Sequence, residues 1–164
     1  FLRSFYNPVQ NELLTQAYVT VEFQRVVDQA HLDSTGLSPA RYARRKGWFY
    51  GYSRAALRGG KVAPFNVISH NAPSCAYYCK FNEEYAITLN MQDILQAIEA
   101  EASLDVKMSA NNAPSLILTI PYYYMVGYIM KLSDTDSRLA NLRAKAQVKI
   151  NAIKAQLPPK NMSE

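Results

Sequence analysis

The residues that could do chemistry lie mainly in one stretch where positive charges and aromatic rings alternate. Arginine and lysine can contact phosphate or carboxylate groups, and an exposed ring can stack on a nucleic-acid base. On a helix, residues three or four positions apart share a side, so several arginines could face one partner together. The candidate surface for a nucleic acid or another anionic partner comprises Arg41, Arg44, Arg45, Lys46, Trp48, Tyr50, Arg54, Arg58 and Lys61.

The positive charge of this stretch is local. No acidic residue occurs between Asp33 and Glu83, whereas eight of the 18 lysines and arginines of the chain fall there. The rest of the sequence holds the other ten bases and all 13 acids. A local excess of positive charge steers a protein toward an anionic partner. The alternative is a solvated cationic face whose rings belong to the core.

Residues 26–46 also fit a helix-turn-helix motif. A helix over 26–32, a turn at Gly36 and a second helix over 38–46 would present arginines suited to phosphate or guanine contacts. Both helices would be short, and the sequence gives no clear third helix. This alternative therefore rests on spacing alone.

Groups for catalysis or metal binding are few. The chain has two histidines, His31 and His70. A nucleophile and base made of Cys75 and His70 lacks an orienting group, and a zinc site of His70, Cys75 and Cys79 lacks a fourth ligand and a standard spacing. Glu83 and its neighbour Glu84 are expected to be solvated. We expect no catalytic residue, no metal and no cofactor.

The two cysteines are expected to be separate thiols in the core. In one strand, at about 3.3 Å per residue, Cys75 and Cys79 would lie about 13 Å apart on one face. A disulfide cannot span that distance. Two cysteines also make no disulfide framework, so the chain does not resemble a disulfide-rich secreted protein.

Length and composition favour one globular domain over residues 1–164. Apolar residues make up 49% of the chain and charged residues 19%, which suits a packed core rather than disorder. The expected fold is α+β, with a four- to five-stranded antiparallel or mixed sheet and one helix between strands. An N-terminal helical region and a C-terminal amphipathic helix packed on the sheet complete it, and residues 158–164 are expected to be a frayed tail.

The first half of the chain is expected to be mostly helix and loop. Apolar spacing over 9–32 favours a helix, although a strand-like alternation runs through 17–23. Ser38 and Pro39 can start a short helix that ends near Gly47. The segment 62–74 contains two prolines and is expected to be a loop.

The centre of the chain contains clearer strands. Alternation over 75–81 and 85–89 predicts two strands joined by a turn at 82–83. A helix over 90–104 and a strand over 106–110 follow.

A tyrosine-rich run over 116–130 predicts one long strand. Pro121 removes a ladder donor and Gly127 weakens the interior, so the strand should lie at an edge or bend. Tyrosine suits interfaces because it joins an apolar ring to a polar tip, although it can also simply fill sheet positions. The candidate protein interface comprises Tyr122, Tyr123, Tyr124 and Tyr128.

The last predicted element is a helix that follows Ser133. Ser133 and Asp136 form a capping box, and Pro158-Pro159 ends the helix. Apolar residues between them repeat close to every 3.6 positions, which is why the helix is expected to be amphipathic.

These observations favour a non-enzymatic structural or assembly subunit of a larger complex. It would bind other protein subunits, as a complex or an oligomer, and its basic surface at 41–61 would contact an anionic partner. The alternative is a nucleic-acid-binding module that uses the segment 41–58. An enzyme with an unrecognised site is the third hypothesis.

The compartment is open from the sequence. The chain begins at Phe1 rather than Met, as would a fragment of a longer protein or a product of N-terminal processing. Maturation of a virion protein and removal of an organelle presequence are two such processes. The longest apolar run is too short and too polar for a membrane span, which takes about 20 residues.

Overall fold

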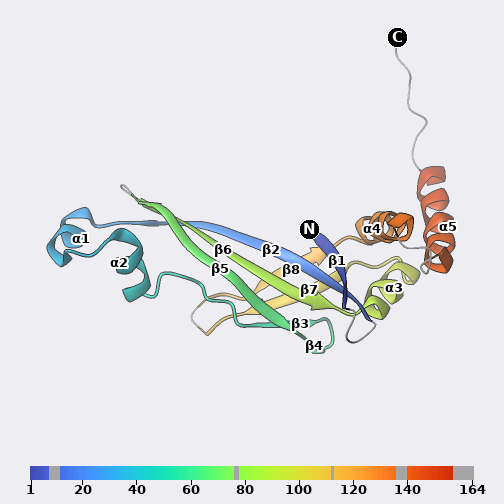
Figure 1. Ribbon diagram of the computed structural model, residues 1–164, viewed down its shortest axis with the longest axis horizontal. Helices are drawn as coiled ribbons and strands as arrows, with labels where there is room; N and C mark the ends of the chain where they lie inside the picture. Colours follow the sequence, from blue (N-terminus) through green and yellow to red (C-terminus); the bar gives the residue numbers. More distant parts are fainter. Residues whose placement is uncertain (8–11, 76–77, 112, 136–139, 157–164) are drawn as a thin grey trace, which may run out of the picture. The chain divides into compact units, whose positions relative to one another are not determined.

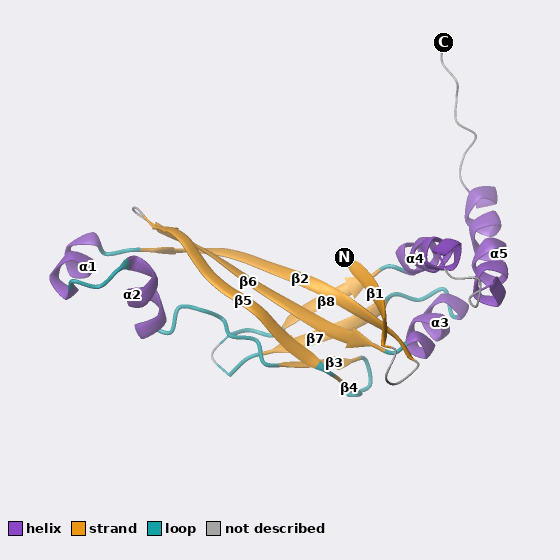
Figure 2. Cartoon of the chain, in the orientation of Figure 1, coloured by secondary structure: helices purple, strands orange, loops and turns teal. Residues whose placement is uncertain are grey.

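The chain folds into two compact units, one made of residues 1–90 and 105–118 and the other of residues 91–104 and 119–164. The residues that the structure describes form five helices and two four-stranded antiparallel sheets (Figure 2). The fold is therefore α+β, as predicted. The single domain expected from the length stays a prediction, since two such units can belong to one domain. The computed structural model describes residues 1–7, 12–75, 78–111, 113–135 and 140–156 (Figure 1).

The larger sheet is built from long strands. It contains β1 (Leu2–Asn7), β2 (Glu12–Val26), β6 (Tyr78–Leu89) and β5 (Phe65–Cys75), paired in that order. On β6, alternate residues from Cys79 to Leu89 are buried and their neighbours are mostly less covered, as expected for a strand with one face on the core. The long strands β2, β5 and β6 run side by side in Figure 1.

The predicted N-terminal helix over 9–32 is wrong where β2 lies, because the alternation of period two prevails over the helical spacing. β2 pairs with β1 on one side and with β6 on the other, from Thr15–Leu89 to Val26–Tyr78. Thr15, Ala17 and Val19 are buried and alternate with more exposed residues. Pairing with strands on both sides stabilises the extended conformation of β2, and these partners cannot be recognised from the sequence of this segment alone.

The hairpin of β5 and β6 corrects three predictions. The segment 62–74, expected to be a loop, contains β4 (Val62–Ala63) and most of β5, and the expected turn at 82–83 lies inside β6. Cys75 and Cys79 are register partners of these two antiparallel strands, and Cys79 is disulfide-bonded. The expected 13 Å separation and separate thiols are therefore wrong, because the two residues belong to paired strands and not to one strand.

The second sheet pairs β4, β3 (Arg54–Leu57), β7 (Leu104–Ser109) and β8 (Leu116–Ile120) in that order. Alternate residues of β3 and β7 are buried, among them Ala55, Val106 and Met108. β7 confirms the strand predicted near 106–110.

Two short helices follow β2. They are α1 (Gln29–Thr35) and α2 (Pro39–Arg45), and the second confirms the helix predicted after Ser38. Asp28 accepts a hydrogen bond from the backbone N–H of His31 at 3.1 Å and so caps α1. Gly36 ends α1 with φ of 62°, a left-handed conformation that glycine adopts without strain.

The second unit is helical. It holds α3 (Met91–Glu99), α4 (Tyr122–Thr135) and α5 (Ala140–Gln156), and α3 confirms the helix predicted between strands. α5 packs along α4, Lys145 forms an ion pair with Glu99 of α3 at 3.3 Å, and Lys149 forms one with Glu101 at 2.6 Å. The expected packing of this helix on the sheet stays a prediction.

The predicted long strand over 116–130 is correct only up to Ile120. Pro121 then starts a helix, and its carbonyl accepts hydrogen bonds from the N–H groups of Tyr124 and Met125 at 3.1 and 3.2 Å. The buried face of α4 comprises Met125, Val126, Ile129 and Ser133, a helical spacing.

The predicted start of the last helix also needs correction. Ser133 lies inside α4, where its hydroxyl donates to the carbonyl of Met130 at 2.8 Å. It is therefore not a cap, and Asp136, its expected partner, lies outside the described residues. The expected frayed tail at 158–164 lies outside them too.

Candidate anionic-partner surface

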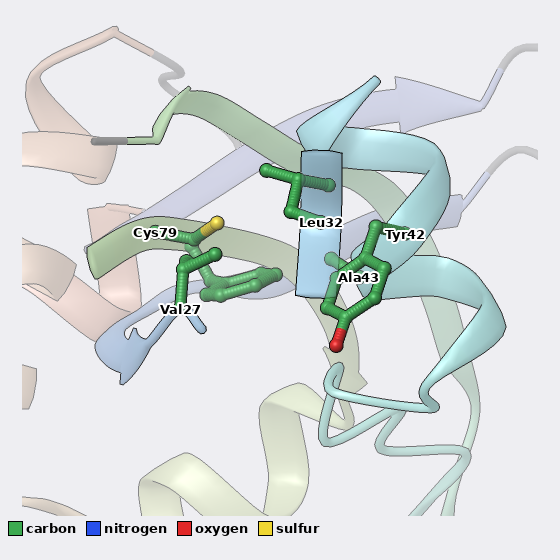
Figure 3. Close-up of a cluster of buried hydrophobic side chains, with 6 residues drawn as sticks. Val27, Leu32, Tyr42, Ala43 and Cys79 are labelled. Atoms are coloured by element: carbon green, nitrogen blue, oxygen red, sulfur yellow. The ribbon is translucent and has the colours of Figure 1, made fainter. Parts of the chain in front are cut away.

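The inner side of α2 is anchored in a buried cluster, and this fixes which residues point outward. Tyr42 and Ala43 pack with Leu32 of α1 and with Cys79 of β6 (Figure 3). Phe81 of β6 belongs to the same cluster. Tyr42 and Ala43 occupy one side of a helix of seven residues. The neighbouring positions must then face solvent.

The four cations of α2 and its C-cap, Arg41, Arg44, Arg45 and Lys46, are all exposed. We call them the α2 cations. Among the residues that the structure describes, no carboxylate forms an ion pair with any of them. Lys46 lies over the ring of Tyr42, with its Nζ 5.6 Å from the ring centre. Their charge is therefore available to a partner.

The predicted surface does not form one patch. α2 packs beside Phe81 of β6. Arg58 and Lys61 lie in the turn between β3 and β4. Pro64, just after β4, is near the other end of β6, where its carbonyl accepts from the backbone N–H of Thr88 at 2.8 Å. Phe81 and Thr88 are seven positions apart on β6, a span of about 23 Å along the strand, so α2 and the β3–β4 turn lie beside different parts of β6.

The group around Arg58 also differs in its charge. Arg58, Lys107 and Asp105 line one cavity with residues of β3 and the turn after it. A carboxylate there reduces the local positive potential. Arg54, at the start of β3, is exposed and donates to the side-chain oxygen of Asn111 at 3.2 Å.

The two predicted stacking rings belong largely to the core. Trp48 makes edge contacts with Tyr42 and Phe81, with ring centres 5.4 and 6.2 Å apart. Tyr50 packs on Phe23 at 4.1 Å, and the guanidinium of Arg25 covers it at 5.3 Å. Both rings are half-buried. Their packing matches the alternative in which the rings of this stretch fill the core.

A buried carboxylate holds the segment that follows α2. Glu83 is fully buried, and it accepts hydrogen bonds from the backbone N–H groups of Tyr50 at 2.6 Å and Gly51 at 3.2 Å. The hydroxyl of Tyr85 donates to the same carboxylate and accepts from the N–H of Tyr52 at 3.1 Å. This network ties the chain between α2 and β3 to β6.

Glu83 was expected to be solvated, and that expectation is wrong. Its side chain lies on the same face as those of Phe81 and Tyr85, two residues before and after it on β6. The alternation of apolar residues through 79–89 was the available signal, and it was missed because a turn was predicted at Asn82 and Glu83.

The tyrosines near Glu83 resist ionisation. Burial raises the pKa of Tyr85 far above its usual value, and the hydrogen bond to Glu83 and the negative charge of that residue raise it further. Burial also raises the pKa of Tyr52, with smaller contributions from Tyr50 and Glu83. A phenolate here would lose solvent and meet an anion.

The described contacts of His70 and Cys79, the candidates for catalysis or metal binding, are with other kinds of group. The ring of His70 stacks on Phe49 at 5.4 Å and meets Tyr85 edge-on at 5.9 Å, and its buried Nε2 has no described hydrogen-bond partner. Cys79 is in a disulfide rather than a thiolate. Across the described ranges, no three histidine, cysteine or acidic residues gather as metal ligands would.

The four tyrosines of the predicted interface lie in α4 rather than in a strand. Tyr123 is 61% exposed and Tyr124 is also exposed, whereas Tyr122 and Tyr128 are half-buried. Two of the four therefore have large exposed side chains.

Comparison of the chain with family models, with curated proteins and with solved structures finds no match. None of the described helices combines the length and the apolar character that crossing a bilayer requires.

We predict that Glu83→Ala lowers the free energy of unfolding by about 3 kcal/mol or more, because it leaves buried donors unpaired at about 1–3 kcal/mol each. Urea denaturation measures this. Glu84→Ala is the control: Glu84 is half-buried and accepts from the Ser69 hydroxyl at 3.0 Å, so its loss should cost less than about 1.5 kcal/mol. Equal losses in the two variants would contradict the role given to Glu83.

We also predict that two of the twelve tyrosines ionise at higher pH in the folded protein than in the urea-unfolded protein. Because the folded pKa values of Tyr85 and Tyr52 are raised, their contribution to stability is complete below about pH 10 and is lost as pH rises through those folded values. Absorbance at 295 nm follows the ionisation. Tyr85→Phe should remove part of the late phase and Tyr123→Phe none of it; a folded protein without a late phase would refute this.

Proposed function

We propose that the protein is a non-enzymatic assembly component that contacts an anionic partner through the α2 cations. The observation that carries this proposal is that all four are exposed and that no described carboxylate pairs with them. Unpaired surface charge of one sign guides association and orients the partners.

An acidic protein surface fits this site better than a single-stranded nucleic acid does. Binding of single strands relies on exposed aromatic rings that stack with bases. Trp48 and Tyr50 are instead engaged with Phe81 and Phe23. The exposed groups of this site are the guanidinium and ammonium groups of the α2 cations, which bind carboxylates and phosphates by charge and hydrogen bonds.

The exposed tyrosines of α4 support a second contact within the same proposal. Tyr123 and Tyr124 are exposed large side chains on one helix, and tyrosine is enriched in protein interfaces. They would bind another protein subunit, as predicted for the run 122–128.

One observation favours the alternative, a nucleic-acid-binding module. α1 and α2 are joined by a short turn at Gly36, and the second helix carries the arginines, as in a helix-turn-helix. Neither helix exceeds seven residues, which is why we place this function second.

The test is a charge reversal with a matched control. The triple variant Arg41→Glu, Arg44→Glu, Arg45→Glu should weaken binding to a polyglutamate chain by about 100-fold, since each exposed contact contributes about 1 kcal/mol. The control variant Arg58→Glu, Lys61→Glu, Lys107→Glu makes the same change of charge and should weaken it less than about fivefold. Fluorescence anisotropy gives the affinities, and circular dichroism checks folding.

Two outcomes would overturn the proposal. Equal losses in the two triple variants would mean that net charge, not the α2 cations, governs binding. Tighter binding to duplex DNA than to polyglutamate, with log affinity falling against log salt at a slope of about −3 to −4 for the α2 cations, would favour the nucleic-acid alternative.

A further inference from the structure

A small pocket lies between α1 and α2, beside the proposed contact surface. It has a volume of about 230 Å³ and is lined by His31 and Thr35 of α1 and by Tyr42, Arg45 and Lys46. The pocket is smaller than the roughly 300–1,000 Å³ of sites for whole small molecules. It can therefore hold one compact group rather than a nucleotide.

The lining is cationic and contains no carboxylate. Lys46 and Arg45 bring two positive charges, and His31 brings a ring whose edge meets Tyr42 at 5.7 Å. The two acids of this part of the chain, Asp28 and Asp33, are not among the lining residues. Asp28 accepts from the N–H of His31 at 3.1 Å, and Asp33 accepts from the side-chain amide of Gln29 at 2.7 Å.

The donors that could reach a ligand are the charged ones. The hydroxyl of Thr35 already donates to the carbonyl of Leu32 at 2.7 Å and accepts from the N–H of Leu37 at 3.3 Å. Arg45 and Lys46 have no described hydrogen bond from their side chains. A guanidinium matches two oxygens of a phosphate at once, and an ammonium adds a third contact.

The end of α2 does not oppose an anion strongly. The last carbonyls of a helix carry partial negative charge. Here those of Tyr42, Ala43 and Arg44 accept from the N–H groups of Lys46, Trp48 and Gly47 at 2.9, 3.1 and 3.0 Å. Each of these three carbonyl oxygens therefore already accepts a hydrogen bond, which reduces its repulsion of an anion.

We infer that this pocket binds a phosphate monoester on the protein partner, such as a phosphorylated serine side chain. A monoester carries up to two negative charges at neutral pH, which the charges of Arg45 and Lys46 balance. A phosphodiester carries one charge and sits within a continuous chain, for which a single compact pocket is a poor match. This inference rests on the proposed function, because it names the group that the partner presents.

The test compares a short serine peptide, its phosphorylated form, its Ser→Glu form and inorganic phosphate by isothermal titration calorimetry. The phosphopeptide should bind about tenfold or more tightly than the glutamate peptide, because a tetrahedral dianion offers more oxygens than a carboxylate. Binding of phosphate alone at the same affinity would identify a site for the free anion and overturn the partner assignment.

Neighbouring arginines provide the matched control. Arg45→Ala removes a residue that lines the pocket, and it should weaken phosphopeptide binding about tenfold or more. Arg44→Ala removes the same charge from the adjacent position, which belongs to the α2 cations but does not line the pocket, so it should weaken binding of the phosphopeptide and of the glutamate peptide alike. Arg45→Ala should instead remove the advantage of the phosphopeptide over the glutamate peptide, and loss of that advantage in both variants would refute the pocket.

The outcomes separate this inference from the proposed function. If polyglutamate binding depends on the α2 cations but the phosphopeptide has no advantage over the glutamate peptide, the pocket assignment fails alone. If the charge-reversal variant binds polyglutamate as the natural sequence does, the proposed function fails first.

Discussion

The hydrogen bonds of the Glu83 carboxylate are the constraint on which the candidate surface depends. They fix the backbone at Tyr50 and Gly51 against β6, immediately after the turn that ends α2. A buried charge is costly unless hydrogen bonds satisfy it, and here two amides and the Tyr85 hydroxyl do so. Because losing any of these hydrogen bonds would be costly, the conformation that places Tyr50 and Gly51 beside Glu83 is strongly favoured. The segment that follows α2 is therefore hydrogen-bonded to β6 through Glu83 and Tyr85.

This anchoring explains how charge and rings of one stretch come to have different roles. Tyr42 and Ala43 fill the cluster with Phe81, and Trp48 joins them. The arginines between and beside them have no place in an apolar cluster, because a charge inside it would lose its solvent. One short helix thus takes part in the core and also exposes a concentrated positive charge. The length of β6 then keeps the cations of the β3–β4 turn away from those of α2.

The fold class, α2, α3 and β7 could be predicted from the sequence because local signals specify them: an N-terminal Pro39, apolar spacing and alternation. β2 could not, since its residues fit both periods and its partners lie far away in the chain. The sequence between Cys75 and Cys79 contains no glycine, so alternation alone suggested a continuous strand. Of the candidate site, the exposure of the α2 cations was predictable from their spacing. The inward packing of Trp48 and the burial of Glu83 were not, because both depend on contacts across the sheet.

The central claim is that the α2 cations, and not the charge of the chain as a whole, form the binding surface. A titration of the intact, isotopically labelled protein with polyglutamate, followed by the backbone amide signals in NMR, tests this most directly. The account predicts that signals of residues 41–46 move in proportion to the bound fraction, while those of 58–61 stay in place. Movement at 58–61 with unchanged signals at 41–46 would contradict it.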